Sequence, residues 1–140
     1  MSETIHASCV AIGGRGVLIA GASGRGKSDL ALRLIDRGAR LVSDDYTLLR
    51  VEGGRLVASA PCNIAGKIEV RGVGIAEMEA LDEAPVCLFV NLDRQAERLP
   101  EAQAVALLRQ NVPSLGLDAL EGSAAIKVEM ALRLFGLPTK

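Results

Sequence analysis

The chain has 140 residues, of which 49% are hydrophobic, and its formal net charge at pH 7 is −1. This length supports one domain with a full hydrophobic core, so we expect a single domain over residues 1–140. The apolar content excludes a disordered chain. The balanced charge and the scarcity of aromatic residues, with one tyrosine and two phenylalanines, argue against a nucleic-acid-binding surface.

The sequence contains no recognisable targeting segment and no closely spaced pair of cysteines. The N-terminus has neither the basic start nor the apolar core of a secretory signal, and the longest apolar run is far shorter than a membrane span. Cys9, Cys62 and Cys87 form no C-x-x-C pair, so we interpret each as a small buried residue in a reducing cytosol. These observations predict a soluble, cytoplasmic protein without a membrane partner.

The first elements form an expected β-hairpin. Residues 5–12 are rich in small and β-branched side chains and predict a strand. Glycines within residues 13–16 indicate a turn, and the apolar residues 17–20 predict the returning strand. His6 lies at the start of this hairpin, and a lone histidine is more often a surface or core residue than a functional one.

A motif of the form G-x-x-x-x-G-K-[ST] follows directly, and it is typical of a phosphate-binding loop. Glycines allow successive backbone N–H groups to face a phosphate chain, and a helix that begins there adds the positive end of its dipole. Lys27 would neutralise the β- and γ-phosphates, and the Ser28 hydroxyl would bind Mg²⁺. The motif comprises Gly21, Ala22, Ser23, Gly24, Arg25, Gly26, Lys27 and Ser28.

The surroundings of the motif match what this chemistry needs. An apolar strand precedes it, and Leu30, Ala31, Leu34 and Ile35 recur after it at helical spacing. Gly38 stands where a glycine ends a helix. The alternative is a glycine-rich turn that binds nothing, and the strand–loop–helix order disfavours it.

Two adjacent carboxylates, Asp44 and Asp45, follow a predicted strand at residues 39–43. In nucleotide enzymes with such a loop, an aspartate at a strand end binds Mg²⁺ or its water ligands, and a second acid can accept a hydroxyl proton. An Asp-rich turn without function fits the same residues. Spacing alone leaves both interpretations open.

The middle of the chain predicts further strands. Residues 46–51 and 55–60 alternate as a second hairpin around a turn at residues 52–54. The next strand places Glu69 and Arg71 two residues apart and therefore on one face. A charge pair of this kind on a strand is usually solvated, so the pattern by itself is weak.

The last third predicts a central strand, an ambiguous segment and a helix. Residues 86–92 are an apolar run typical of a buried strand. Residues 101–110 have a helix-favouring composition but contain a possible strand at 105–108, so their structure stays undecided. Ser123 is a candidate N-cap of a last helix. The larger apolar residues along one side of that helix are Ile126, Met130, Leu134 and Leu137.

Four of these blocks, in this order, resemble the catalytic domain of HPr kinase/phosphorylase. They are residues 5–7, residues 21–28, residues 38–45 and residues 68–75, and the last resembles the signature block of that family. The resemblance extends over residues 5–92 and fades beyond them. It implies a serine kinase that uses ATP and Mg²⁺ and acts on HPr, the small phosphocarrier of the bacterial sugar phosphotransferase system.

The resemblance also implies roles for individual residues. Residues 21–28 would hold the phosphates, and Ser28 and Glu69 match metal-binding positions. Asp45 would be the base that accepts the serine proton. The residues implied as catalytic are His6, Lys27, Asp44, Asp45 and Arg71, with Asp44 supporting the metal ion or its waters and Arg71 steadying the transferred phosphate.

Departures from the family pattern bear on the direction of the reaction. The family commonly carries a separate N-terminal domain, so this sequence resembles a short form made of the catalytic domain alone. The family's late Pro-Gly-Arg-Asn stretch has no counterpart, because residues 112–118 stand at its place and hold no arginine. A C-terminal segment that supports the reverse, phosphorylase reaction would begin about where this chain ends. We therefore expect weak reverse activity, since sequence alone does not place Arg98 or Arg109 in the site.

The sequence thus predicts an α/β fold, namely a P-loop kinase domain of the HPr kinase type with a mixed β-sheet and few helices. The expected function is ATP-dependent phosphorylation of a serine on HPr or a close relative, in a homo-oligomer that the family implies to be a hexamer. One alternative is a P-loop kinase of a small metabolite, because the loop does not select the acceptor. The other is a regulatory module that senses ATP without transfer, against which Asp45 and His6 argue.

Overall fold

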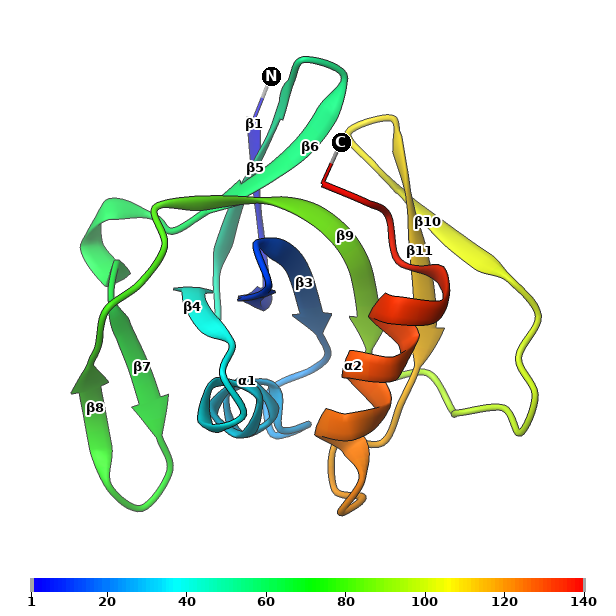
Figure 1. Cartoon of the computed structure of the whole chain (residues 1–140). Coiled ribbons are helices and arrows are strands. Elements are labelled where there is room, and N and C mark those ends of the chain that lie inside the picture. Colours follow the sequence, from blue (N-terminus) through cyan, green and yellow to red (C-terminus); the bar gives the residue numbers. More distant parts are fainter. Residues whose placement is uncertain (1, 140) are drawn as a thin grey trace.

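The computed structural model describes residues 2–139, and their strands form a strongly curved sheet with two α-helices beside it (Figure 1). The helices are α1 (Lys27–Asp36) and α2 (Ala124–Phe135), and a short 3₁₀ helix spans Cys62–Ile64. The strands are β1 (Ser2–Ile5), β2 (Ala7–Ile12), β3 (Arg15–Ala20), β4 (Arg40–Ser43), β5 (Thr47–Glu52), β6 (Arg55–Ser59), β7 (Lys67–Val70), β8 (Gly74–Glu77), β9 (Glu83–Asn91), β10 (Gln103–Leu107) and β11 (Gln110–Gly116).

The main sheet is mixed, as predicted. Its strand order is β1-β5-β6-β9-β3-β2-β4, with β11 pairing with β9 and β10 pairing with β11. β9 runs parallel to β3 and β11 and antiparallel to β6, so this one strand joins the two halves of the sheet. β7 and β8 form a separate two-stranded hairpin.

β3, the strand before the glycine-rich motif, is buried on both of its faces. Val17 and Ile19 belong to the hydrophobic cluster that includes residues of both α-helices. Leu18 points to the opposite face and belongs to the cluster formed with side chains of β5, β6 and β11. This two-sided burial explains why the strand is a continuous apolar run, and it confirms the buried strand predicted at residues 17–20.

The single strand expected over residues 5–12 is instead divided at His6. β1 pairs with β5, whereas β2 pairs with β3 on one side and with β4 on the other. The turn is also shorter than expected, because Gly13 and Gly14 alone adopt positive φ angles of +59° and +81°, and β3 already begins at Arg15. His6 thus lies where the chain passes from one part of the sheet to another.

The helix after the motif confirms its predicted pattern. Leu30, Ala31 and Leu34 of α1 are fully buried against the sheet. Gly38 has φ +111°, and its N–H donates to the carbonyl of Ile35 at 3.0 Å. A residue with a Cβ is strained in this left-handed conformation, so glycine is the residue that suits the end of α1.

The last helix buries a different face from the one that its larger side chains suggested. Apart from Leu132, its buried residues are small or β-branched and include Ala124, Ala125 and Val128, whereas Ile126 and Met130 are exposed. Small side chains let α2 approach the sheet closely, which leaves Ile126, Met130 and Leu134 facing outward. Leu137 lies beyond the end of α2 and packs against the core. Ser123 is the N-cap residue, but its side chain makes no capping hydrogen bond.

Two further expectations are settled by hairpins of the main sheet. The undecided segment at residues 101–110 belongs to the β10–β11 hairpin, in which Leu108 and Arg109 form the turn with positive φ angles of +48° and +64°. Two consecutive residues at positive φ match the twist of a tight hairpin, which explains why a helix-favouring composition was overridden. The hairpin predicted at residues 46–60 is confirmed as β5 and β6.

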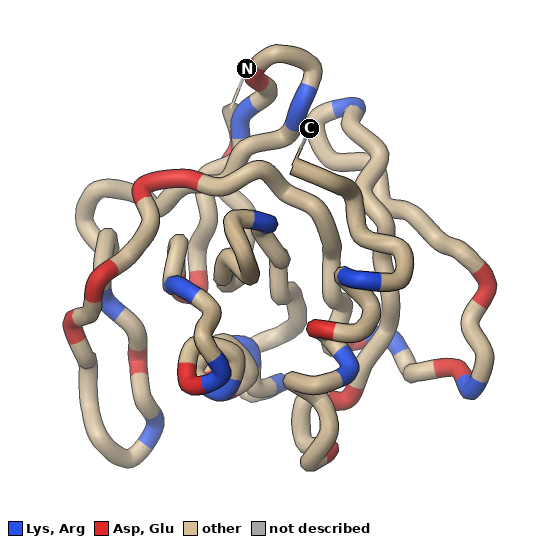
Figure 2. The backbone as a smooth tube through the Cα atoms, viewed as in Figure 1, with Lys and Arg blue, Asp and Glu red and all other residues tan. Residues whose placement is uncertain are grey.

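The cysteine interpretation is correct at two positions of three. Cys9 and Cys87 are buried, whereas Cys62 is exposed on the 3₁₀ helix, and no disulfide joins the three. Basic and acidic residues alternate along the backbone without a large region of one sign (Figure 2). No helix within residues 2–139 has the length and apolarity needed to cross a membrane.

Candidate active site

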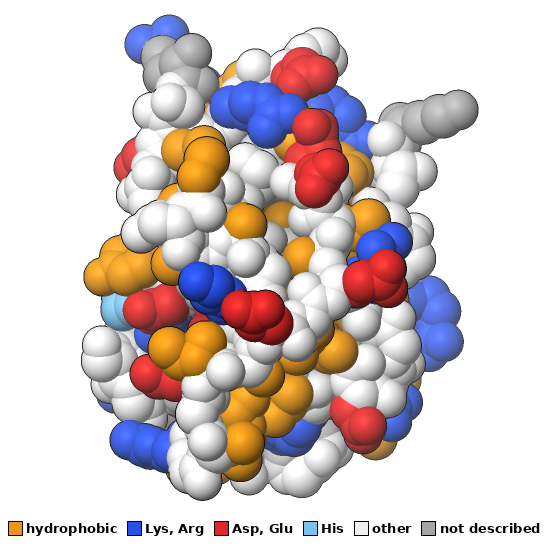
Figure 3. All heavy atoms as spheres, turned by 90° about the vertical axis from the view of Figure 1, so that its left-hand side faces the viewer, with side chains coloured by type: hydrophobic (Ala, Val, Ile, Leu, Met, Phe, Trp, Pro, Cys, Tyr) orange, Lys and Arg blue, Asp and Glu red, His pale blue; other side chains and the backbone are white. Residues whose placement is uncertain are grey.

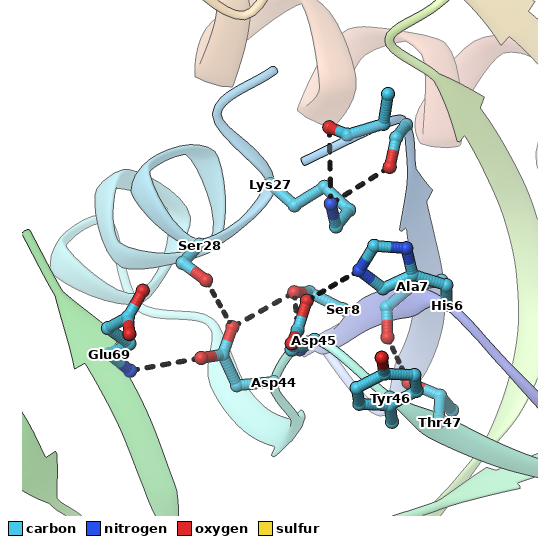
Figure 4. A network of polar contacts seen from close by, with 12 residues as sticks. His6, Ala7, Ser8, Lys27, Ser28, Asp44, Asp45, Tyr46, Thr47 and Glu69 are labelled. Atoms are coloured by element: carbon cyan, nitrogen blue, oxygen red, sulfur yellow. Dashed lines mark hydrogen bonds and ion pairs between the residues drawn. The ribbon is translucent and has the colours of Figure 1, made fainter. Parts of the chain in front are cut away.

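The candidate site lies at one edge of the main sheet, where several chain segments meet (Figure 4). β3 and β4 end at this edge, and β2, which runs antiparallel between them, begins there. The topology therefore brings together the glycine-rich loop after β3, Asp44 and Asp45 after β4, and His6 at the start of β2. Three stretches far apart in the sequence form one polar network.

The glycine-rich loop (residues 21–26) has the strand–loop–helix context that the motif predicted. Gly24 and Gly26 adopt φ angles of +87° and +94°, which only glycine adopts readily. Gly26 is the N-cap of α1, so the first free N–H groups of that helix face the space beside the loop. Lys27 is 6% exposed, and its Nζ donates to the carbonyl oxygens of Gly21 at 2.8 Å and Ala22 at 3.4 Å.

Asp44 is the centre of the network. Its Oδ1 accepts the hydroxyl of Ser28 at 2.6 Å and the hydroxyl of Ser8 at 3.0 Å, and its Oδ2 accepts the backbone N–H of Glu69 at 2.9 Å. The residue is only 6% exposed. A buried carboxylate with three donors is held in place, and its position joins β4, α1, β2 and β7.

Asp45 is oriented away from that buried centre. Its φ of +65° is unusual for a non-glycine residue, and its backbone N–H donates to Ser8 Oγ at 3.0 Å. Its Oδ1 lies 2.7 Å from His6 Nε2, and the two side chains are 52% and 37% exposed. The strained backbone turns this second carboxylate toward solvent and the histidine.

Tyr46 completes the support of the histidine. Its ring stacks on the imidazole of His6, with centroids 5.1 Å apart and an interplanar angle of 26°. The backbone N–H of Tyr46 donates to the carbonyl of Asp44 at 2.7 Å. His6 is therefore held between a carboxylate and an aromatic face and is not a freely rotating surface side chain.

A cleft of about 800 Å³ opens beside this network. Residues of the glycine-rich loop, both aspartates, and Glu69 and Arg71 line it. The β7–β8 hairpin forms one of its walls, and on that face of the molecule hydrophobic side chains lie exposed among charged ones (Figure 3). This volume lies within the range of about 300–1,000 Å³ that is typical of small-molecule sites.

Glu69 and Arg71 do not share a strand face as expected. β7 ends at Val70, and Arg71 lies in the turn that leads to β8, although both residues line the cleft. Neither Arg98 nor Arg109 lines it, and Arg109 lies in the β10–β11 turn. Arg71 and Lys67 are thus the cationic side chains that the hairpin contributes to the cleft.

The oxygen atoms beside the loop fit a magnesium ion. Ser28, Asp44 and Glu69 offer hydroxyl and carboxylate oxygens, and the Glu69 carboxylate lies on the same side of the network as the Ser28 hydroxyl (Figure 4). Within residues 2–139, no group of three or more His, Cys, Asp or Glu side chains is placed to hold a metal ion. Such a sparse set suits Mg²⁺, which usually binds one or two carboxylates and takes its other ligands from phosphates and water.

Ser8 is a site residue that the sequence did not single out. It is completely buried, donates to the carboxylate of Asp44 and accepts the backbone N–H of Asp45, so one hydroxyl links the Asp44 side chain to the backbone of Asp45. Its position two residues after His6 carries the only available signal, since alternate residues of a strand share a side. That signal is too common to identify a functional residue.

Comparison with known proteins identifies close similarity to one family. The family model described as "HPr Serine kinase C-terminal domain" matches residues 1–84. HPr kinase/phosphorylase of Geobacillus kaustophilus is 38% identical over 97% of this chain and 49% of that protein. The corresponding protein of Caldanaerobacter subterraneus subsp. tengcongensis is 38% identical over 91% of this chain and 47% of its own length. The chain therefore spans about half the length of these relatives.

A solved structure extends the similarity to the fold. The Hpr(Ser) kinase/phosphatase from Coxiella burnetii superposes with a TM-score of 0.82 and 31% sequence identity, covering 94% of this chain and 88% of that one. The agreement includes residues beyond 92, and so does the sequence similarity to the Geobacillus kaustophilus protein, so the expectation that the resemblance fades there is wrong. The α/β fold with a mixed sheet and few helices is thus that of an HPr kinase domain.

Proposed function

The chain belongs to the family of HPr serine kinase C-terminal domains, and on that premise we propose that it transfers the γ-phosphate of ATP to a serine of HPr or a close relative. The observation that carries the proposal is the contact of 2.7 Å between His6 Nε2 and Asp45 Oδ1. It holds an accessible carboxylate at the mouth of a cleft that also contains the glycine-rich loop. A serine hydroxyl needs such a base close to a bound phosphate chain.

The phosphates of ATP would lie along the glycine-rich loop and the first turn of α1. Backbone N–H groups there and the buried Lys27 provide positive charge, and the helix dipole adds to it. Because Lys27 already contacts the loop carbonyls at 2.8 and 3.4 Å, its ammonium group is close to the place of the phosphates. Ser28, Asp44 and Glu69 would hold Mg²⁺, which would offset phosphate charge.

Asp45 would accept the proton of the acceptor serine as that oxygen attacks the γ-phosphate. His6 orients the Asp45 carboxylate and is itself held by the Tyr46 ring. Arg71, from the turn after β7, lines the cleft and would stabilise charge on the transferred group. The exposed position of the His6–Asp45 pair suits an acceptor serine carried on a folded protein. The use of ATP would locate the reaction in the cytoplasm.

Radiolabel transfer from ATP to purified HPr tests the proposal. The reaction with HPr is compared with the chain alone and with the chain plus small-metabolite mixtures, each with and without Mg²⁺. We expect label on HPr only, and phosphoserine in its digest. Label on a metabolite instead would establish the small-molecule kinase, and ATP binding without transfer to any acceptor would establish the sensing module.

A further inference from the structure

Asp93 is a carboxylate that contacts the glycine-rich loop from the side opposite the cleft network. It lies two residues after the end of β9, and it does not line the 800 Å³ cleft. Its Oδ1 and Oδ2 accept the backbone N–H of Ala22 at 3.1 and 3.0 Å. Its Oδ1 also lies 3.2 Å from the Nε of Arg25. Both of these partners belong to the loop.

The segment that carries Asp93 is fixed to the sheet. The backbone N–H of Asp93 donates to Asn91 Oδ1 at 2.9 Å, and the N–H of Leu92 donates to the carbonyl of Ala20 at 2.8 Å. A Cβ added to Gly21 would lie 3.0 Å from the Cβ of Leu92, so the loop is in close contact with this segment. Asp93 is therefore an anchored acceptor.

The peptide that joins Gly21 to Ala22 is held at both of its polar ends. Asp93 accepts its N–H, and its carbonyl oxygen accepts the ammonium group of Lys27 at 2.8 Å. Because a peptide is planar, fixing the direction of the N–H also fixes the direction of the carbonyl. The orientation of this one peptide connects Asp93 to Lys27.

We propose that Asp93 is a positioning residue that, through the Gly21–Ala22 peptide, holds Lys27 where its ammonium group reaches the phosphates of a nucleotide. The nature of that ligand, a nucleoside triphosphate, rests on the proposed function. Arg25 has a clear part in the arrangement, because its charge offsets that of Asp93. Without the charge of Arg25, the carboxylate of Asp93 next to the anion-binding loop would repel the ligand.

The first test uses the ligand-free chain and nuclear magnetic resonance. In Asp93→Ala, we expect the amide of Ala22 to exchange at least about tenfold faster, because its acceptor is lost. The side-chain signals of Lys27 should shift in the same spectra. Asp93→Asn should retain part of the protection, since its amide oxygen still accepts. Glu83→Gln is the matched control, because Glu83 is a similarly exposed carboxylate paired with Arg50 away from the loop.

Unchanged Ala22 exchange and unchanged Lys27 signals in a folded Asp93→Ala protein would overturn the proposal. If Asp93→Ala does not fold, Asp93→Asn decides, since the loss of one oxygen and of the charge must still alter both signals. A change in Ala22 exchange without any change at Lys27 would also contradict it, because Asp93 would then order the loop alone.

The second test is a double-mutant cycle on ATP affinity, measured by calorimetry. Asp93→Ala should weaken ATP binding about tenfold, the order expected for one hydrogen bond to a charged group. In a Lys27→Ala background, the same substitution should have no further effect. An equal loss in both backgrounds would show that Asp93 does not act through Lys27. Failure of the unaltered chain to bind ATP would contradict the proposed function, whereas the ligand-free spectra would still decide the role of Asp93.

Discussion

The carboxylate of Asp44 accepts a hydrogen bond of 2.6 Å from the hydroxyl of Ser28, and this contact ties the end of β4 to the first turn of α1. Asp44 is buried and already has three donors. Its neighbour Asp45 is 52% exposed and contacts His6. The two adjacent carboxylates, equivalent in the sequence, therefore have different environments, which favours Asp45 as the base and Asp44 as the support of a metal ion.

Asp45→Asn should abolish most phosphate transfer while ATP binding survives. The change keeps the shape of the side chain and removes its ability to accept a proton, and loss of a general base typically slows a reaction by about 10²–10⁴-fold. The transfer rate to HPr and the ATP affinity by calorimetry measure the two parts. The same substitution at the neighbouring position, Asp44→Asn, is the matched control. It should weaken Mg²⁺ binding and so raise the Mg²⁺ concentration that the reaction needs. Wild-type rates in Asp45→Asn would assign the base role to Asp44.

Lys27→Ala should lose both nucleotide affinity and turnover, because a neutral methyl group cannot replace the ammonium charge. Lys27 is buried, so thermal unfolding must accompany the assay to show that the variant is folded. Lys127→Ala, which removes an exposed lysine paired with Glu121 on the last helix and away from the cleft, is the comparison for a non-specific loss of charge. Unchanged ATP affinity in Lys27→Ala would exclude the loop as the nucleotide site.

The kinase rate should clearly exceed the reverse, phosphorylase rate. The reverse step gathers three anionic groups and therefore depends more on cationic donors. Lys67 and Arg71 line the cleft, whereas Arg98 and Arg109 do not. Phosphate-dependent release of pyrophosphate from phosphorylated HPr, measured beside the forward rate at matched concentrations, tests this. A reverse rate equal to the forward rate would show that the cations present are sufficient.

Stability should fall at alkaline pH because of Cys9. Burial raises the pKa of its thiol from 9.0 to about 12, so between these values the thiol ionises in the unfolded chain and stays neutral in the folded one. The stabilising effect is complete below pH 9 and is lost as the pH rises toward 12. By pH 10, the loss is about 1.4 kcal/mol in the free energy of unfolding.

Urea unfolding of the chain at pH 8 and pH 10 measures this loss. In Cys9→Ala, the pH-dependent part should shrink by that amount, whereas Cys62→Ala, at an exposed cysteine, should behave like the unaltered chain. A loss of the same size in Cys9→Ala would mean that other groups cause the alkaline instability.

The parts of the fold that follow from local sequence were the ones that could be predicted. The motif at residues 21–28, the helix with its terminal Gly38 and the buried strand β3 each have their cause within a few neighbouring residues. The division at His6 has no such local cause. β1 is separate from β2 because it pairs with β5, and this pairing joins segments that are distant in the sequence. The exposed side of α2 has a similar cause, since close approach to the sheet favours its small residues.

The same distinction applies to the site. The family resemblance pointed to His6, Asp44, Asp45 and Glu69, and the structure brings all four to one edge of the sheet. Ser8 and Asp93 form hydrogen bonds with partners 36 and 71 residues away. A serine in a strand and an aspartate in a turn have many ordinary roles, so only the folded geometry distinguishes them.

The place of β9 between β3 and β6 has a consequence for the order in which the protein can assemble. His6, the glycine-rich loop, both aspartates and Glu69 all lie within the first 84 residues, the segment that the family model matches. During synthesis these residues leave the ribosome before most of β9 (Glu83–Asn91) does. Until then, the β1-β5-β6 strands and the β3-β2-β4 strands have no shared neighbour, and one flank of β3 is open. The nascent chain therefore carries the residues of the candidate site before β9 can join the two halves of the sheet, and until then the open edge of β3 exposes apolar residues that favour aggregation.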